Sequence, residues 1–162
     1  SRLSIPSLIF LCTIALVIPL WMPSAFKINS TPRLSSYLAD IWGPFEPTVI
    51  HRLVASDRTV FVDITADWCI TCQVNKGLVI NDKDVLAGLS ANNVVAMQAD
   101  WTRPNEEITR YLATFGRFGI PFNAVYGPNA PNGIILSELL TKPAVLNALK
   151  NAGPRSEVKK GP

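Results

Sequence analysis

The sequence has little charge, one histidine and few cysteines. Of its 162 residues 17% are charged, and the 15 basic and 12 acidic side chains are spread along the chain. A nucleic-acid-binding protein would gather its basic residues in one stripe, so no nucleic-acid partner is expected. Three cysteines are too few for a disulfide-stapled miniprotein. With 48% hydrophobic residues the chain is also too apolar to be disordered, and one compact domain with an appendage is predicted.

The appendage is an apolar segment at the start of the chain. No charged residue lies between Arg2 and Lys27. As a helix this stretch would be roughly 36 Å long, which exceeds the hydrocarbon thickness of about 30 Å. We therefore expect residues 1–26 to hold a transmembrane helix, the last span of a larger membrane domain, which contacts the membrane through residues 3–22. A cleavable signal peptide is the alternative, because a short apolar core followed by small residues fits that pattern too.

Composition changes after this segment. Residues 27–46 contain three serines and two prolines and are expected to form a linker, whereas residues 155–162 are expected to form a flexible tail. Between them, residues 47–154 carry regular patterns that predict one globular domain. Strands are expected at 59–65, 93–99, 121–126 and 133–136, and helices at 73–80, 84–89, 104–115 and 143–149. This order predicts an α/β fold with a mixed sheet.

Cys69 and Cys72 form a Cys-x-x-Cys motif between a predicted strand and a predicted helix. At this spacing on the first helical turn both sulfurs lie on one face, close enough for a reversible disulfide. Unpaired N–H groups and the positive end of the helix dipole favour a thiolate at Cys69. We expect Cys69 to attack a partner disulfide and Cys72, one turn further and more shielded, to resolve the mixed disulfide.

Other uses of the cysteine pair remain open. Zinc would need two more ligands, and the candidates are Cys12 in the apolar segment and the lone His51. Two thiolates suffice for Cu(I), so a copper-binding module is the alternative from another functional class. A purely structural disulfide is a further alternative. His51 lacks a partner in its helical pattern, and we expect no catalytic or metal-binding role for it.

The string VFVDITADWCITCQVNK, residues 60–76, resembles the active-site strand, turn and helix of thioredoxin-fold proteins. It specifically resembles the periplasmic C-terminal domain of the DsbD family of thiol:disulfide interchange proteins, whose ScsB-like relatives are associated with copper tolerance. The strings ADWT at 99–102 and FGRFGIPF at 115–122 are also similar to that family. The resemblance covers about residues 47–152. It implies a thioredoxin-like fold, with a mixed central sheet flanked by helices, after a transmembrane helix.

The resemblance also implies roles for single residues. Asp63 matches the buried acidic residue that handles the proton of the second cysteine, and burial would raise its pKa accordingly. Ile120 and Pro121 match the loop whose proline is cis and faces the two sulfurs, and Trp68 matches the aromatic residue before the first cysteine; all three are expected to bind the substrate protein. Lys76 departs from the family, some members of which have an acidic residue there. A cation at this position would favour the thiolate.

The function implied is that of a protein-disulfide reductase without a cofactor. Electrons would pass from a transmembrane dithiol domain of the same protein, through Cys69 and Cys72, to periplasmic disulfide or thioredoxin-like proteins. The implied location is the bacterial inner membrane, with the globular domain in the periplasm. A free-standing, tethered thioredoxin-like reductase that serves cytochrome c assembly is the alternative within the same class.

Overall fold

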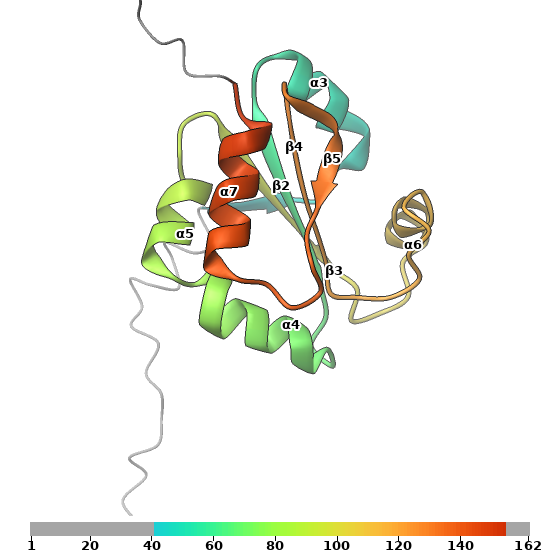
Figure 1. The fold of residues 1–162 in the computed structure, drawn as a ribbon. Coiled ribbons are helices and arrows are strands. Elements are labelled where there is room, and N and C mark those ends of the chain that lie inside the picture. The colour runs from blue at the N-terminus through green and yellow to red at the C-terminus, as the bar shows by residue number, and fades with distance from the viewer. Residues whose placement is uncertain (1–40, 155–162) are drawn as a thin grey trace, which may run out of the picture. The chain divides into compact units, whose positions relative to one another are not determined.

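The computed structural model describes residues 41–154, and Figure 1 shows their fold. The strands in this part of the chain are β1 (Trp42–Pro44), β2 (Thr59–Thr65), β3 (Val94–Asp100), β4 (Phe122–Gly127) and β5 (Ala130–Ile135). The helices are η1 (Pro47–Val49), α3 (Ile50–Ala55), α4 (Ile70–Asn75), η2 (Lys76–Ile80), α5 (Lys83–Leu89), α6 (Glu106–Ala113) and α7 (Lys142–Ala152). The predicted alternation of strands and helices is confirmed.

The strands form a single mixed sheet in the order β1-β3-β2-β4-β5. β1, β3 and β2 run parallel, whereas β4 and β5 are antiparallel to their neighbours. The parallel pair β2 and β3 needs a long crossover, which α4, η2 and α5 supply. The hairpin of β4 and β5 needs only a tight turn. This topology places β2 at the centre of the sheet.

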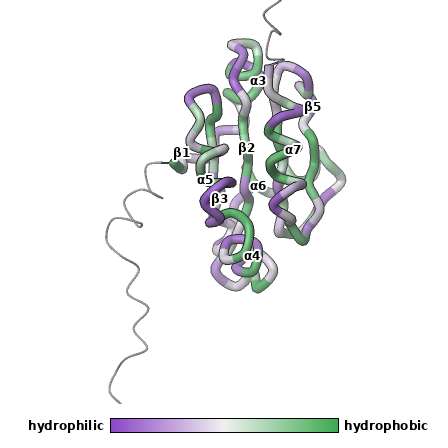
Figure 2. The backbone as a smooth tube through the Cα atoms, turned by 60° about the vertical axis from the view of Figure 1, so that its left-hand side comes forward, coloured by the Kyte–Doolittle hydropathy of each residue, from purple (hydrophilic) through white to green (hydrophobic). Residues whose placement is uncertain are grey.

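β2 is buried along its whole length because helices cover both faces of the sheet. Its residues alternate between the two faces, as a strand requires. Val60, Val62 and Ile64 pack in a core with α3 and α6. Phe61 packs on the opposite face with α5 and α7. Figure 2 shows β2 running through the middle of the domain, with hydrophobic residues along much of its length.

β1 corrects the predicted extent of the linker. Residues 27–46 were expected to form a linker, yet Trp42–Pro44 pairs with β3. The ring of Trp42 packs 6.1 Å from that of Phe61, which anchors the short strand to the core. A strand of three residues is too short to show an alternation of apolar and polar residues, and a proline such as Pro44 is unusual in strands. An edge strand tolerates proline because one side needs no ladder hydrogen bonds.

Other boundaries also differ from the prediction, and two of them lie near the cysteine helix and the last hairpin. The helix expected at 73–80 begins earlier, at Ile70, and ends in the π-helical turn η2. The turn between the last two strands is shorter than expected, because β5 begins at Ala130. Gly127 ends β4 where a Cβ atom would lie 2.1 Å from the carbonyl oxygen of Ala152, so α7 can pack closely there.

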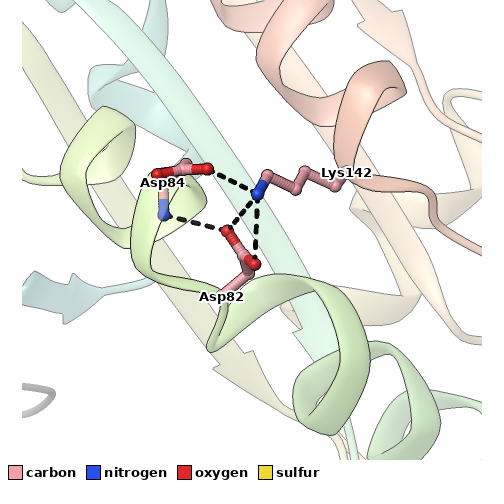
Figure 3. Close-up of polar contacts among 3 residues, drawn as sticks. All are labelled: Asp82, Asp84 and Lys142. Carbon is pink, nitrogen blue, oxygen red and sulfur yellow. Dashed lines mark hydrogen bonds and ion pairs between the residues drawn. The ribbon is translucent and has the colours of Figure 1, made fainter.

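Lys142 joins the starts of two helices that lie side by side on one face of the sheet. Its Nζ lies 2.5 Å from Asp84 Oδ2 and 3.0 Å from Asp82 Oδ1 (Figure 3). Asp82 is also the N-cap of α5, where its carboxylate accepts a hydrogen bond from the Asp84 N–H at 2.9 Å. These contacts link α5 to the beginning of α7.

The predicted transmembrane helix, Cys12 within it, most of the expected linker and the expected tail lie outside the described residues. Between residues 41 and 154, no helix has both the length and the apolar character needed to cross a bilayer.

Candidate active site

The cysteine pair lies at the junction between the central strand and α4. β2 ends at Thr65, a short turn follows, and Cys69 is the N-cap residue of α4. Cys69 and Cys72 form a disulfide, with their Cα atoms 5.2 Å apart. Only 5% of Cys69 and 2% of Cys72 is exposed, so Cys72 is the more shielded of the two.

A hydrogen bond connects Cys69 to the helix that follows it. The backbone N–H of Cys72 donates to Cys69 Sγ at 3.2 Å. Amides of the first helical turn have no partner within the helix, and an N-cap side chain supplies one. After reduction the same N–H would stabilise a thiolate at Cys69, because hydrogen bonds to a charged acceptor are stronger than those to a neutral one.

The loop before β4 reaches the disulfide from a distant part of the sequence. Its Ile120–Pro121 peptide bond is cis, as the resemblance implies. Ile120 packs against a small buried cluster formed by Ala66, Cys69 and Cys72. Pro121 is buried and leads directly into β4. The structure thus brings Ile120 to the two sulfurs.

Asp63 is buried in the middle of β2, with 3% of the residue exposed. Gln98 Nε2 donates to Asp63 Oδ2 at 2.8 Å, and Asn123 Nδ2 donates to Asp63 Oδ1 at 2.9 Å. Burial raises the pKa of Asp63 above its ordinary value, while these hydrogen bonds and the positive charge of Lys76 act in the opposite direction. A carboxyl group with a raised pKa is suited to exchanging protons near neutral pH.

Gln98 and Asn123 were not identified from the sequence. Each is a polar residue within an otherwise apolar strand, and that is the signal that was available. Their contact with Asp63 depends on the strand register, in which Asp63 is paired with Gln98 on one side and with Asn123 on the other.

Trp68 lies on the surface beside the disulfide, with 60% of the residue exposed. Its indole Nε1 donates to the carbonyl oxygen of Thr102 at 3.3 Å, and the backbone N–H of Asp67 donates to Thr102 Oγ1 at 3.0 Å. Trp68 borders an open groove of about 530 Å³, together with Ile120 and Phe118. Phe118, 82% exposed, was also missed from the sequence. This groove gives the disulfide an apolar neighbouring surface.

Metal-binding residues do not gather near the cysteines in the described part of the chain. Residues 41–154 contain no group of three or more histidine, cysteine, aspartate or glutamate side chains that could hold a metal ion. His51, the one histidine, is exposed on α3, away from the cysteine cluster.

Comparisons with known proteins agree with this architecture. Residues 49–128 match the family model described as thioredoxin-like. Over 89 residues the chain is 33% identical to the thiol:disulfide interchange protein DsbD of Ralstonia nicotianae. That match covers 53% of this chain and 14% of the DsbD sequence, so the chain corresponds to a small part of that protein.

Two solved structures share the fold. The C-terminal domain of DsbD from Neisseria meningitidis, in its oxidised form, superposes with a TM-score of 0.51 at 20% identity, over 67% of this chain and 99% of that domain. A thioredoxin from Thermus thermophilus gives a TM-score of 0.51 at 22% identity, over 67% of this chain and 82% of the other. The predicted thioredoxin-like α/β fold is confirmed.

Proposed function

We propose that this chain, which carries a DsbD-like thioredoxin domain, is a thiol:disulfide oxidoreductase that works through Cys69 and Cys72. The observation that carries the proposal is the cysteine pair itself. It forms a disulfide at the N-cap of a helix, buried against the cis-proline loop. A dithiol in such a position can be oxidised and reduced without a prosthetic group.

The reaction begins with the reduced pair. The Cys69 thiolate attacks a disulfide of the partner, forming an intermolecular S–S bond while the other partner sulfur leaves as a thiolate. Cys72 then loses its proton and attacks the Cys69 sulfur. The Cys69–Cys72 disulfide forms, and the partner is released with both of its cysteines reduced. Two electrons have passed to the partner, and a donor dithiol must return two to this chain.

Asp63 is proposed as the group that receives the proton of Cys72. Its carboxyl group is buried in β2, the strand that leads to the cysteine pair, and its pKa is raised by that burial. The carboxylate that accepts this proton returns it to a thiolate in the next cycle.

Trp68, Ile120 and Pro121 are proposed to bind the partner protein. Trp68 and Ile120 border the apolar groove beside the disulfide, and Pro121 follows Ile120 directly through a cis peptide bond. Apolar side chains around a redox pair allow a partner segment to be held while its disulfide is aligned with Cys69.

The similarity to DsbD supports a place for this domain in a larger pathway. We propose that the electrons come from a transmembrane dithiol domain of the same protein and pass to periplasmic disulfide or thioredoxin-like proteins. Residues 1–26 would then form the last membrane span, joined by a linker to the domain that ends near residue 154 and is followed by a flexible tail. The location would be the bacterial inner membrane, with the globular domain in the periplasm.

Trapping the mixed disulfide tests the exchange reaction. In the full chain, purified in detergent and reduced, Cys72→Ala should accumulate a covalent adduct with proteins of a periplasmic extract, and a thiol reductant should remove it. The matched control is Cys69→Ala, which keeps a thiol but lacks the attacking one. Equal trapping by both variants, or none by Cys72→Ala, contradicts the proposal.

The direction of electron flow can be measured with glutathione buffers. A reduction potential of about −270 to −200 mV is expected for an electron donor, whereas about −120 mV would indicate an oxidant. The copper-binding alternative predicts a different outcome: little disulfide reduction and tight binding of one Cu(I) by the two thiolates.

A further inference from the structure

Asp63 lies between two amide side chains at one level of the sheet. In the strand register Asp63 is directly opposite Gln98 on β3 and directly opposite Asn123 on β4. Residues paired in this way point to the same face of a sheet. Each amide donates to a different carboxylate oxygen, at 2.8 Å and 2.9 Å. The carboxyl group is therefore held from both sides by strands that are far apart in sequence.

This arrangement is costly for a sheet core. Asp63 and Asn123 are 3% and 2% exposed, and Gln98 is half-buried. Buried polar groups destabilise a fold unless they are hydrogen-bonded, and apolar residues at these three positions would avoid the cost. Each amide donates one hydrogen bond to the carboxylate, so neither amide can be removed without leaving a carboxylate oxygen short of a partner.

Three residues, each from a different element, influence the pKa of this carboxyl group in the oxidised chain. β3 and β4 contribute the two neutral amides, and η2 contributes the cation Lys76. Cys72, which lies in the buried cluster with Ala66, Cys69 and Ile120, becomes a titratable thiol when the disulfide is reduced. Burial is the largest influence and raises the pKa of Asp63, whereas Gln98, Asn123 and Lys76 lower it.

We propose that Gln98 and Asn123 are positioning residues that hold Asp63 as a carboxylate able to take the proton of Cys72, an inference that rests on the proposed thiol exchange. Both amides donate N–H groups, and a carboxylate accepts them more strongly than a neutral acid does. When Asp63 takes the proton, one oxygen becomes a hydroxyl and its hydrogen bond with an amide weakens. The two amides thus limit the affinity of Asp63 for the proton and favour the transfer of the proton back to a thiolate.

Two variants test this role in the full chain, purified in detergent. Gln98→Met and Asn123→Leu each remove one amide while keeping a side chain of similar size. Each should raise the affinity of Asp63 for its proton about tenfold, the effect of losing one hydrogen bond to a charged group. The measurement is the titration of the Asp63 carboxyl carbon by NMR in the oxidised chain. Asn75→Leu is the matched control, since Asn75 is also 2% exposed but bonds to the backbone of residues 138 and 140.

The kinetic readout is the pH dependence of mixed-disulfide resolution. If more Asp63 is protonated at neutral pH, it accepts the Cys72 proton less often, so the rate should fall by up to about tenfold and recover at higher pH. In an Asp63→Asn background the same two substitutions should leave the pH profile unchanged. A purely structural role would lower stability without this dependence on Asp63. Gln98→Met is the variant expected to fold in any case, because Gln98 is only half-buried.

The outcomes separate this inference from the function on which it rests. An unchanged Asp63 titration in Gln98→Met overturns the positioning role, while trapping through Cys69 would still support thiol exchange. A shifted titration with an unchanged rate profile also overturns the role, because Asp63 then does not handle the proton. Shifts in both readouts, abolished in the Asp63→Asn background, support it.

Discussion

The hydroxyl oxygens of Tyr111 and Tyr126 lie 2.5 Å apart and share a hydrogen bond. Tyr111 belongs to α6 and Tyr126 to β4, so the bond fastens this helix to the sheet. The ring of Tyr111 also packs edge to face against Phe45 and Phe122. Burial raises the pKa of both tyrosines above the ordinary value.

Removing both of these hydroxyls should destabilise the domain by less than the sum of the two single removals. Tyr126→Phe leaves the Tyr111 hydroxyl without its partner, at a cost of about 1–3 kcal/mol in the free energy of unfolding. In the double variant with Tyr111→Phe no orphaned hydroxyl remains, so the loss should be smaller than the sum of the single losses. Urea unfolding of the parent, the two single variants and the double variant measures the coupling between the hydroxyls. Strictly additive losses in the free energy of unfolding would contradict the prediction.

Gly127→Ala should be strongly destabilising. The added Cβ would lie 2.1 Å from the carbonyl oxygen of Ala152, and the backbone of α7 would have to move. Overpacking of this kind costs about 1–3 kcal/mol or more. Gly77→Ala is the matched control, because nothing lies within 4 Å of its added Cβ, and in a helix it should stabilise by about 0.5–1 kcal/mol. Thermal unfolding gives the melting temperature of both variants, and equal changes in the two melting temperatures would refute the prediction.

Asp63→Asn should change how stability depends on pH. Burial raises the pKa of Asp63 in the folded chain above that in the unfolded chain, so the folded state binds more protons between the two values. The free energy of unfolding therefore falls as pH rises from the ordinary carboxyl pKa of about 4 through the raised one. Asparagine removes this fall. Denaturant unfolding at several pH values measures the free energy of unfolding of both chains. The value for Asp63→Asn should rise relative to that of the parent as pH approaches neutral. A difference between the two chains that does not change with pH would count against the prediction.

Asp82→Ala should lower the melting temperature more than Lys142→Ala does. The hydrogen bond from the Asp84 N–H lowers the pKa of Asp82 most, and Lys142 adds to this. Asp82→Ala removes both the helix cap and its ion pair, whereas Lys142→Ala removes only partly exposed ion pairs that salt screens. A lowered pKa means that the contribution of Asp82 is present above the ordinary carboxyl pKa and is lost as pH falls. Melting curves at low and high salt test the ranking, which fails if Lys142→Ala has the larger effect.

The sequence revealed those parts of the fold whose signals are local. The run TVFVDIT predicted a strand at 59–65, and β2 has these bounds. The helix at 104–115 was predicted from its apolar face, and α6 lies within that range. Such patterns depend on neighbouring residues alone.

Features that depend on tertiary pairing were not predictable in this way. Gln98 and Asn123 meet Asp63 from 35 and 60 positions away, so their role follows from the sheet register and not from any spacing in the chain. Lys142 reaches Asp82 and Asp84 only because α5 and α7 are neighbours. Strand β1 is too short to show a period, and its place is decided by the core contact of Trp42 with Phe61.

Because the Cys72 N–H donates a hydrogen bond to Cys69 Sγ, the NMR signal of this backbone amide should respond to the chemical state of that sulfur. The electron density on an acceptor atom changes the resonance of the N–H that it binds, and this sulfur passes through disulfide, thiolate and mixed-disulfide forms. A single peak in an amide spectrum would then report the oxidation state of the working protein. No added probe would be needed, because the Cys72 N–H in the first turn of α4 is itself the reporter group.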